Sequence, residues 1–342
     1  MPADEAYCNT GTIGASPLRV LHAVVDHMVR SMVEVAHVDW RGGGMSLLSG
    51  YSSYKELRTK IGELINADYS LIALTQNATM GMNLLANGLD LPAGSGVLIT
   101  DIEHPGGRCG WELLAERRGT TLHKAKIPIP SESPEQIVEA FEDAIRPETR
   151  VTSFPHISSA HGIIMPVRQL CSLAREHGIL SIIDGAQATG HIPIDVKEIG
   201  CDAYYSSPHK WLMAPAGNGF LYVKETLIDE VWTTLASSQW NNHEDNGYRL
   251  GQRGTGNPAL LVGLEAALDL HFEIGPERVY RRIKELGDRL RRGLGQVEGT
   301  EIVTPVHPEM SSGLTTFKVD GVEGKALQNE LWRRGKIQPR AL

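Results

Sequence analysis

Residues 184–211 read DGAQATGHIPIDVKEIGCDAYYSSPHKW, and they place an acid and an amine after two consecutive apolar runs. The first run, ILSIID, ends at Asp184, and the second, DAYYSS, ends just before His209 and Lys210. Short β-branched and aromatic runs of this kind are typical of buried strands. Where such strands are neighbours, the carboxylate and the amine lie side by side at one edge of a sheet. Open α/β sheets bind their ligands at that edge.

The segments around this stretch alternate between short apolar runs and longer runs with helical periodicity. This alternation predicts an α/β fold with a mostly parallel sheet and helices on both faces. The expected strands lie near residues 70–75, 96–100, 149–155, 179–184, 202–207 and 219–223.

The regions outside the expected sheet predict the domain organisation. Helical runs at 17–35 and 53–67 precede the sheet, and a glycine-rich stretch at 40–54 is expected to be irregular. From residue 258 a long helical stretch leads to a smaller strand-and-helix region. We therefore expect three parts, listed here in chain order: an N-terminal segment at the active site (1–20), a large cofactor-binding domain (21–258), and a long helix with a C-terminal small domain (259–342).

The composition excludes several classes of protein. The chain has 342 residues, 41% of them apolar, and a net charge of −8, which argues against nucleic acid or an anionic membrane surface as a partner. The four cysteines are far apart and form no CxxC motif, so we expect neither a disulfide framework nor a metal site. No apolar run approaches the roughly 20 residues that span a bilayer, and no secretory signal is visible at the start. These features predict a cytoplasmic protein.

Polar residues follow five of the expected strands at the points where the strands end. Any one of them is well explained as a cap or a turn residue, but five strand ends that converge are a stronger signal. The residues are Thr75–Thr79, Glu103, His104, Ser158, Ser159, Asp184, Gln187, Ser207, His209 and Lys210.

Asp184 and Lys210 together indicate pyridoxal phosphate chemistry. A lysine forms a Schiff base with a carbonyl when burial or a nearby cation lowers its pKa toward neutrality. A carboxylate beside a pyridine nitrogen keeps that nitrogen protonated, so the ring can accept electrons from a carbanion. The alternative is a purely structural ion pair between Asp184 and Lys210. A buried ion pair adds little to stability, so the sequence favours a catalytic role for the two residues.

The segment TQNATMGMN, residues 75–83, offers a cradle for the cofactor phosphate. Small residues stand at the turn, and backbone amides are exposed where a helix begins near Thr79. An ordinary capped helix would look the same, so this signal is weak on its own. Ser207 and His209 add possible donors, and His104 has a flat ring that can stack on the cofactor.

These motifs together resemble the class V aminotransferase family of pyridoxal phosphate enzymes, which has fold type I. The similarity runs from NTGTIG at residue 9 to RGTGNP at residue 253, and its most specific part is DGAQATGHIPIDV followed by SSPHKW. The resemblance implies an amino-acid substrate and a homodimer with shared active sites.

The resemblance also implies a role for each matching residue. Lys210 would form the Schiff base and move the substrate α-proton, Asp184 would hold the pyridine nitrogen, and His104 would stack on the ring. Gln187 would bond the phenolic oxygen of the ring. The phosphate would be held by Ala78, Thr79, Ser207, His209 and, from the neighbouring subunit, Thr255.

The chain departs from the family pattern in three places. Ser159 stands where many cysteine desulfurases have Asn, and Ala78 stands where the phosphate loop usually has a hydroxyl. The sequence also stops at RRGKIQPRAL, so we expect the small domain to be truncated relative to the family. Arg340 in that segment is a candidate ligand for the substrate carboxylate, with an exposed terminal charge as the alternative reading.

The predicted function is therefore that of an enzyme acting at the α-carbon of an amino acid, similar to an aminotransferase. An amino-acid epimerase or a C–S lyase of the cysteine desulfurase type is the alternative within the family. A non-catalytic protein that keeps the cofactor fold is the alternative from another class. A nicotinamide-binding fold also alternates strands and helices, but the chain has no GxGxxG directly after a strand.

Overall fold

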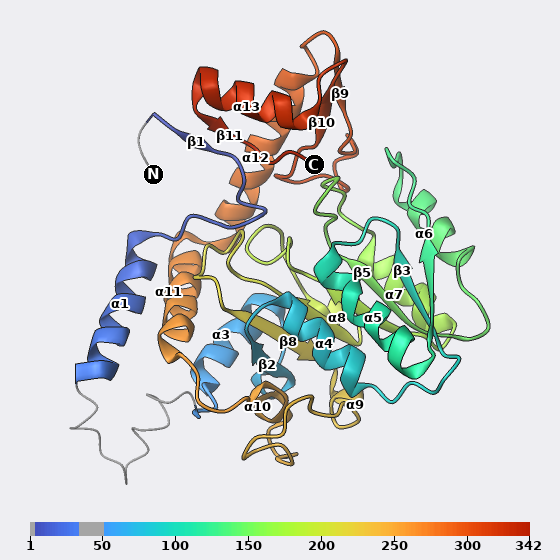
Figure 1. Ribbon diagram of the computed structural model, residues 1–342, viewed down its shortest axis with the longest axis vertical. Coiled ribbons are helices and arrows are strands. Elements are labelled where there is room, and N and C mark those ends of the chain that lie inside the picture. The colour runs from blue at the N-terminus through green and yellow to red at the C-terminus, as the bar shows by residue number, and fades with distance from the viewer. Residues whose placement is uncertain (1–3, 34–50) are drawn as a thin grey trace.

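The computed structural model describes residues 4–33 and 51–342 of the chain (Figure 1). Most of the glycine-rich stretch that we expected to be irregular lies outside these residues. The described chain has two parts. The larger part, called the large layer here, is a sheet together with the helices that cover it, and a smaller group of strands and helices lies beyond one edge of this sheet.

The large layer is built on a seven-stranded sheet with the order β2-β8-β7-β6-β5-β3-β4. All neighbouring strands are parallel except β8, which runs antiparallel to both β2 and β7. The mostly parallel sheet predicted from the sequence is thus present. The strands are β2 (Ile72–Thr75), β3 (Gly96–Thr100), β4 (Thr121–Ala125), β5 (Thr149–Pro155), β6 (Leu180–Asp184), β7 (Ala203–Ser206) and β8 (Gly219–Val223).

The strand β4 is the one member of this sheet that the sequence pattern did not predict. It lies at the edge of the sheet and pairs with β3 alone. Thr121 and Lys124 on this strand are exposed. An edge strand faces solvent on part of its surface, so it lacks the continuous apolar run that identifies the central strands.

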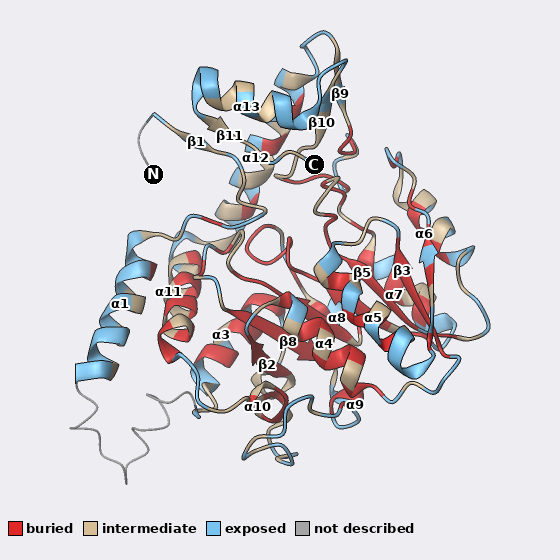
Figure 2. Cartoon of the chain, viewed as in Figure 1, coloured by how far each residue is buried: buried red, intermediate tan, exposed pale blue. Residues whose placement is uncertain are grey.

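Both faces of the sheet are buried by helices, as Figure 2 shows by the red strands at the centre. Alternate residues of each strand point to opposite faces. Ile183 and Tyr204 therefore belong to one hydrophobic cluster, and Ile182 and Tyr205 to another. The helices of the large layer are α1 (Leu18–Val33), α3 (Lys55–Ile65), α4 (Ala78–Gly88), α5 (Pro105–Arg118), α6 (Pro134–Glu142), α7 (Val167–Glu176), α8 (Val196–Ile199), α9 (Glu225–Ile228), α10 (Asn246–Gly251) and α11 (Pro258–Ile274).

The long helical stretch after residue 258 is two helices instead of one. Helix α11 ends at Ile274. The next residue, Gly275, has a φ of 94°, in the region that favours glycine, and α12 (Pro276–Leu294) then begins with a proline. The chain therefore turns at Gly275 and leaves the large layer. Among the described residues, no helix is both long and apolar enough to cross a membrane.

The smaller group of elements contains residues from both the first and the last described segments of the chain. Strands β9 (Thr300–Ile302) and β10 (Phe317–Val319) form an antiparallel pair near α13 (Gly324–Gly335). Strand β1 (Ala6–Tyr7) pairs in parallel with β11 (Ile337–Gln338), so the N-terminal segment lies beside the last described strand (Figure 1). The three-part domain division predicted from the sequence stays a prediction.

Candidate active site

The carboxyl ends of three neighbouring strands meet at one edge of the sheet. The register pairs Pro155 of β5 with Asp184 of β6, and Asp184 with Tyr205 of β7. Lys210 follows β7 after a short turn. The acid and the amine that the sequence placed at two strand ends are therefore brought to the same edge.

Asp184 is a buried acid with one oxygen engaged by the backbone. Its Oδ1 accepts a hydrogen bond of 2.8 Å from the Ala186 N–H. Burial raises the pKa of Asp184, and the positive charge of Lys210 opposes that rise. The carboxylate thus depends on Lys210 and on the Ala186 amide to keep its charge.

Lys210 is an amine whose surroundings favour the neutral form. Loss of solvation lowers its pKa, the charge of Asp184 opposes this, and the charge of Arg340 lowers the pKa further. A lysine must lose its proton to attack a carbonyl. The site therefore prepares this amine for covalent chemistry.

His104 caps the N-terminus of α5 and presents a flat ring to the site. Its Nδ1 accepts a hydrogen bond of 3.0 Å from the Gly106 N–H, which leaves the proton of the neutral ring on Nε2. Desolvation and the positive charge of Lys210 both lower the pKa of His104. A neutral, flat imidazole can stack on an aromatic ring.

The N-termini of α4 and α5 approach each other beside the Lys210 turn. The Ala78 N–H donates a hydrogen bond of 2.7 Å to Ser207 Oγ, which joins α4 to the segment after β7. A Cβ added at Gly106 in the first turn of α5 would lie 2.8 Å from Thr79 Oγ1. His209 Nδ1 is buried with no partner among the described residues. Helix N-termini and free donors at one place favour an anion.

Gln187 has both ends of its amide engaged. Nε2 donates a hydrogen bond of 2.8 Å to the Gly11 carbonyl, and Oε1 accepts one of 2.8 Å from Trp211 Nε1. One N–H of Nε2 is left for another acceptor. The sequence did not single out Trp211, although it directly follows Lys210.

Ser159 and Arg340 line a cavity of about 670 Å³ between the N-terminal segment and the smaller group of elements. Cys8, Gly11 and Trp211 also line this cavity. The charge of Arg340 lowers the pKa values of both Lys210 and His104. The guanidinium therefore influences the site at the carboxyl ends of the strands, called the strand-end site below, which contains Asp184, Lys210 and His104. The two candidate substrate residues are therefore found at one cavity.

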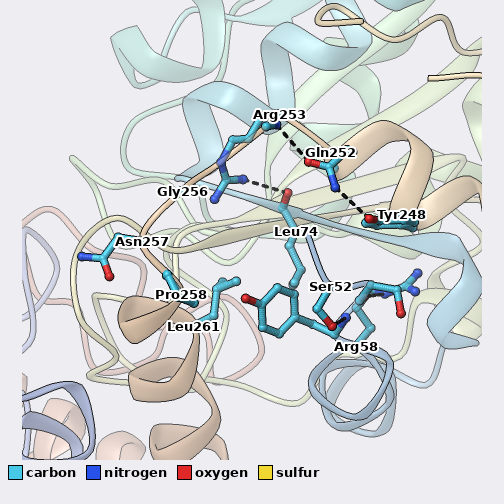
Figure 3. Close-up of a pocket in the computed structure, with 15 residues that line it drawn as sticks. Ser52, Arg58, Leu74, Tyr248, Gln252, Arg253, Gly256, Asn257, Pro258 and Leu261 are labelled. Carbon is cyan, nitrogen blue, oxygen red and sulfur yellow. Dashed lines mark hydrogen bonds between the residues drawn. The ribbon is translucent and has the colours of Figure 1, made fainter. Parts of the chain in front are cut away.

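Thr255 lies elsewhere within the single chain. Its neighbours Gly254 and Gly256 line a small pocket formed by α3, α10 and the start of α11 (Figure 3). In this loop, Arg253 Nη1 donates to the Leu74 carbonyl at 3.3 Å. Asp184 and Lys210 do not line this pocket. The loop is thus anchored at Leu74 of β2, and the pocket beside it contains neither Asp184 nor Lys210.

Two further residues at the strand-end site were given no role by the sequence. Glu103 was noted only as a polar strand end, and Tyr205 only as part of an apolar run. Both approach Gly107 together with Asp184. The available signals were that Glu103 directly precedes His104, and that Tyr205 is an aromatic residue at the end of a run before a candidate lysine.

The donor set fits pyridoxal phosphate. The structure offers an amine of lowered pKa for the aldehyde, a buried acid for the pyridine nitrogen and a flat imidazole for the ring. The helix N-termini and the unpartnered His209 Nδ1 suit the phosphate. Fold and site together define a pyridoxal phosphate enzyme of fold type I.

The chain belongs to the class V aminotransferase family, because the family model described as Aminotransferase class-V matches residues 14–341. It is 33% identical to an isopenicillin N epimerase of Streptomyces clavuligerus over 298 residues, which are 83% of this chain and 75% of the relative. It is 27% identical to a probable cysteine desulfurase of Methanothermobacter thermautotrophicus, over 94% of this chain and 79% of the relative.

Solved structures show the same fold. A lysine-to-alanine mutant of C-DES, with glycine covalently linked to its PLP cofactor, superposes with a TM-score of 0.87 at 26% identity. The alignment covers 99% of this chain and 90% of that one. A complex of the cystine C–S lyase C-DES with its product cysteine persulfide gives a TM-score of 0.86 at 25% identity, over 99% and 91% of the two chains. The expected family, fold and cofactor are confirmed.

Proposed function

We propose that this pyridoxal phosphate enzyme removes the α-proton of an amino acid with Lys210, and that the overall reaction is epimerisation. The observation that supports proton removal is the lowered pKa of the Lys210 amine opposite the buried Asp184 carboxylate. The similarity to isopenicillin N epimerase supports the choice of outcome. Transamination, which the sequence pattern favoured, and C–S lysis begin with the same proton removal and are the alternative outcomes.

Each site residue has a role in this proposal. Lys210 would hold the cofactor and would accept the α-proton, and for epimerisation a proton from solvent would return to the opposite face of the α-carbon. Asp184 would accept a hydrogen bond from the protonated pyridine nitrogen, and His104 would stack on the ring. When bound, pyridoxal phosphate supplies the electron sink for the pair left at the α-carbon.

The remaining roles concern orientation. Gln187 offers its free N–H to the phenolic oxygen of the ring, while Gly11 and Trp211 hold its amide in place. Ala78, Thr79, Ser207 and His209 bind the phosphate at the two helix N-termini. Substrate enters the cavity lined by Ser159 and Arg340, where the guanidinium pairs with its carboxylate.

We further propose a homodimer in which Thr255 of each chain reaches the phosphate of the other. The pocket beside the loop that holds Thr255 is not lined by Asp184 or Lys210 of the same chain. Helix α1 also leaves an apolar stripe at helical spacing exposed, which a second copy can cover. The stripe consists of Leu18, Leu21, Val25, Val29 and Met32. The cytoplasmic location expected from the sequence stays a prediction.

A panel of L-amino acids incubated in deuterated water tests the reaction. Proton NMR reports exchange at the α-carbon, and chiral chromatography reports the epimer. Epimerisation gives the other enantiomer with no loss of amine. Transamination gives an oxo acid with equal gain of amine on an added acceptor, and C–S lysis gives an oxo acid with release of sulfur.

Lys210→Ala is the control for this panel. We expect it to lose α-proton exchange by roughly 10³-fold or more, because the base is removed. Wild-type enzyme that binds the cofactor but exchanges no α-proton with any member of the panel would support the non-catalytic alternative.

A further inference from the structure

Side-chain oxygens of two carboxylic acids and one tyrosine approach a single point beside Gly107, near the start of α5. A Cβ added to Gly107 would lie 3.1 Å from Asp184 Oδ2, 3.3 Å from Glu103 Oε2 and 3.5 Å from Tyr205 Oη. The three residues come from different segments: the end of β6, the loop after β3 and the end of β7. The absence of a side chain at Gly107 lets their oxygen atoms gather there.

Hydrogen bonds from Thr100 to the other carboxyl oxygen, Oε1, hold the Glu103 side chain in this place. The Thr100 hydroxyl donates a hydrogen bond of 2.7 Å to Glu103 Oε1, and the Thr100 N–H donates a longer one of 3.4 Å. Thr100 is the last residue of the buried strand β3. The carboxyl of Glu103 is thus fixed to the sheet by Oε1, while Oε2 points toward the gap that Asp184 Oδ2 also faces.

Two buried carboxyls that face the same small gap do not both carry a charge readily. Burial, with the charge of Asp184 as a further cause, raises the pKa of Glu103 to about 8, although Thr100 and Arg108 oppose the rise. Lys210 favours the charge on Asp184 instead. Burial therefore favours the neutral form of Glu103, while Lys210, the Ala186 amide and His104 favour the charged form of Asp184.

We propose that Glu103 is a positioning residue for Asp184. Its neutral carboxyl, fixed by Thr100, stands across Gly107 from Asp184 Oδ2, holds the orientation of the Asp184 carboxylate and keeps the acid cluster at a single negative charge. This inference rests on the proposed contact between Asp184 and the pyridine nitrogen. Oδ1 is oriented by the Ala186 amide, and Glu103 orients the other side of the same carboxylate.

The test uses the holoenzyme loaded with cofactor that is labelled with nitrogen-15 in the ring. The ring nitrogen signal reports its contact with Asp184 without any turnover. Glu103→Ala removes the carboxyl that faces Asp184. We expect the ring nitrogen signal to move toward that of the unprotonated form, and α-proton exchange to slow by roughly tenfold or more. Glu103→Gln keeps a neutral group of the same shape and should restore most of the wild-type signal.

Two further variants make the outcome specific. Gly107→Ala places a methyl group between the two carboxyls and should reproduce the signal change of Glu103→Ala while Glu103 is intact. Glu116→Ala, an exposed acid on the same helix, is the matched control and should leave the signal in place. Circular dichroism confirms that each variant is folded.

The results separate this inference from the proposed function. If Asp184→Asn moves the signal but Glu103→Ala does not, the positioning role is wrong and the function stands. If Asp184→Asn leaves the signal in place, the proposed contact of Asp184 is itself wrong. If Glu103→Gln moves the ring nitrogen signal as far as Glu103→Ala does, a charged Glu103 is required. That result would overturn the proposal that a neutral Glu103 positions Asp184.

Discussion

Gln187 joins the N-terminal segment to the strand-end site, because its Nε2 donates a 2.8 Å hydrogen bond to the Gly11 carbonyl. A second bond acts nearby, where the Gly14 N–H donates to the His209 carbonyl at 2.7 Å. The segment before α1 thus contacts both the residues after β6 and the turn that contains Lys210. Residues 8–11 of this segment also line the 670 Å³ cavity.

Asp184→Asn should leave the cofactor bound and slow α-proton exchange by roughly 100-fold, because the ring loses the charge that keeps its nitrogen protonated. Absorbance measures cofactor content, and proton NMR in deuterated water measures exchange. Asp195→Asn, a change at the cap of α8, is the control. An exchange rate equal to that of wild type in the loaded Asp184→Asn variant would contradict the assignment.

A mixed dimer tests whether Thr255 serves the other subunit. One chain has Lys210→Ala and the other has Thr255→Arg, so each parent homodimer should be nearly inactive. If Thr255 crosses, one of the two sites in the mixed dimer has both residues intact, and about half of the wild-type activity per dimer should return. Tagged chains and light scattering establish that mixed dimers are present. No gain over either parent in confirmed mixed dimers would place Thr255 at its own site.

Glu103→Gln should stabilise the protein in a pH-dependent way. Because folding raises the pKa of Glu103 from 4.5 to about 8, the folded protein keeps a proton that the unfolded chain has released between these values. Wild-type stability from this group therefore falls as the pH rises through that window. Gln does not titrate, so the advantage of the variant should be small at pH 4.5 and grow up to about pH 8.

Thermal melts of the holoenzyme measure this effect. We expect Glu103→Gln to exceed wild type in Tm by roughly 2 °C or more at alkaline pH. Asp184, Arg108 and Tyr205 are the other ionisable groups around Glu103, and they are the same in both proteins. Glu116→Gln serves as the control. A Tm difference that does not change with pH would mean that Glu103 titrates at its ordinary value.

Efficient formation of a protein-bound persulfide from L-cysteine is not expected. All four cysteines are free thiols, and burial raises the pKa of Cys171 to about 12 and the pKa of Cys201 well above its ordinary value. Cys109 is exposed on α5, and Cys8 lines the 670 Å³ cavity. Desolvation raises the pKa of the Cys8 thiol, which reduces its thiolate fraction.

Alanine release from L-cysteine, together with mass analysis of Cys8 and Cys109, checks this expectation. Cys8→Ser and Cys109→Ser are compared under the same conditions. Fast alanine release that stops in one of these variants, with a persulfide on the same residue in the wild type, would show a desulfurase reaction.

The central strands and the Asp184–Lys210 pair were predictable because each depends on local sequence. A buried strand that ends in a polar residue leaves a readable pattern, and parallel strands bring such ends together. The edge strand β4 was missed because Thr121 and Lys124 face solvent. The break at Gly275 was missed because glycine is also tolerated within helices.

Contacts between distant segments were not predictable from periodicity. The bond from Gln187 to Gly11 joins residues 176 positions apart, and the convergence of Glu103 and Asp184 depends on sheet order and on the small size of Gly107. The placement of Arg340 at the cavity likewise depends on how the last described elements fold back. Such relationships arise from tertiary packing, which a single sequence does not encode at any one position.

The parallel pairing of β1 with β11 gives the molecule a mechanical linkage. Ala6 and Tyr7 are fastened to Ile337 and Gln338, and a few residues farther on the same segment is fastened to Gln187 and to the Lys210 turn. The same short segment therefore bonds to β11 at one end and to the residues around Lys210 at the other. The position of β11 and the position of the site are thus fixed relative to one another through residues 8–14.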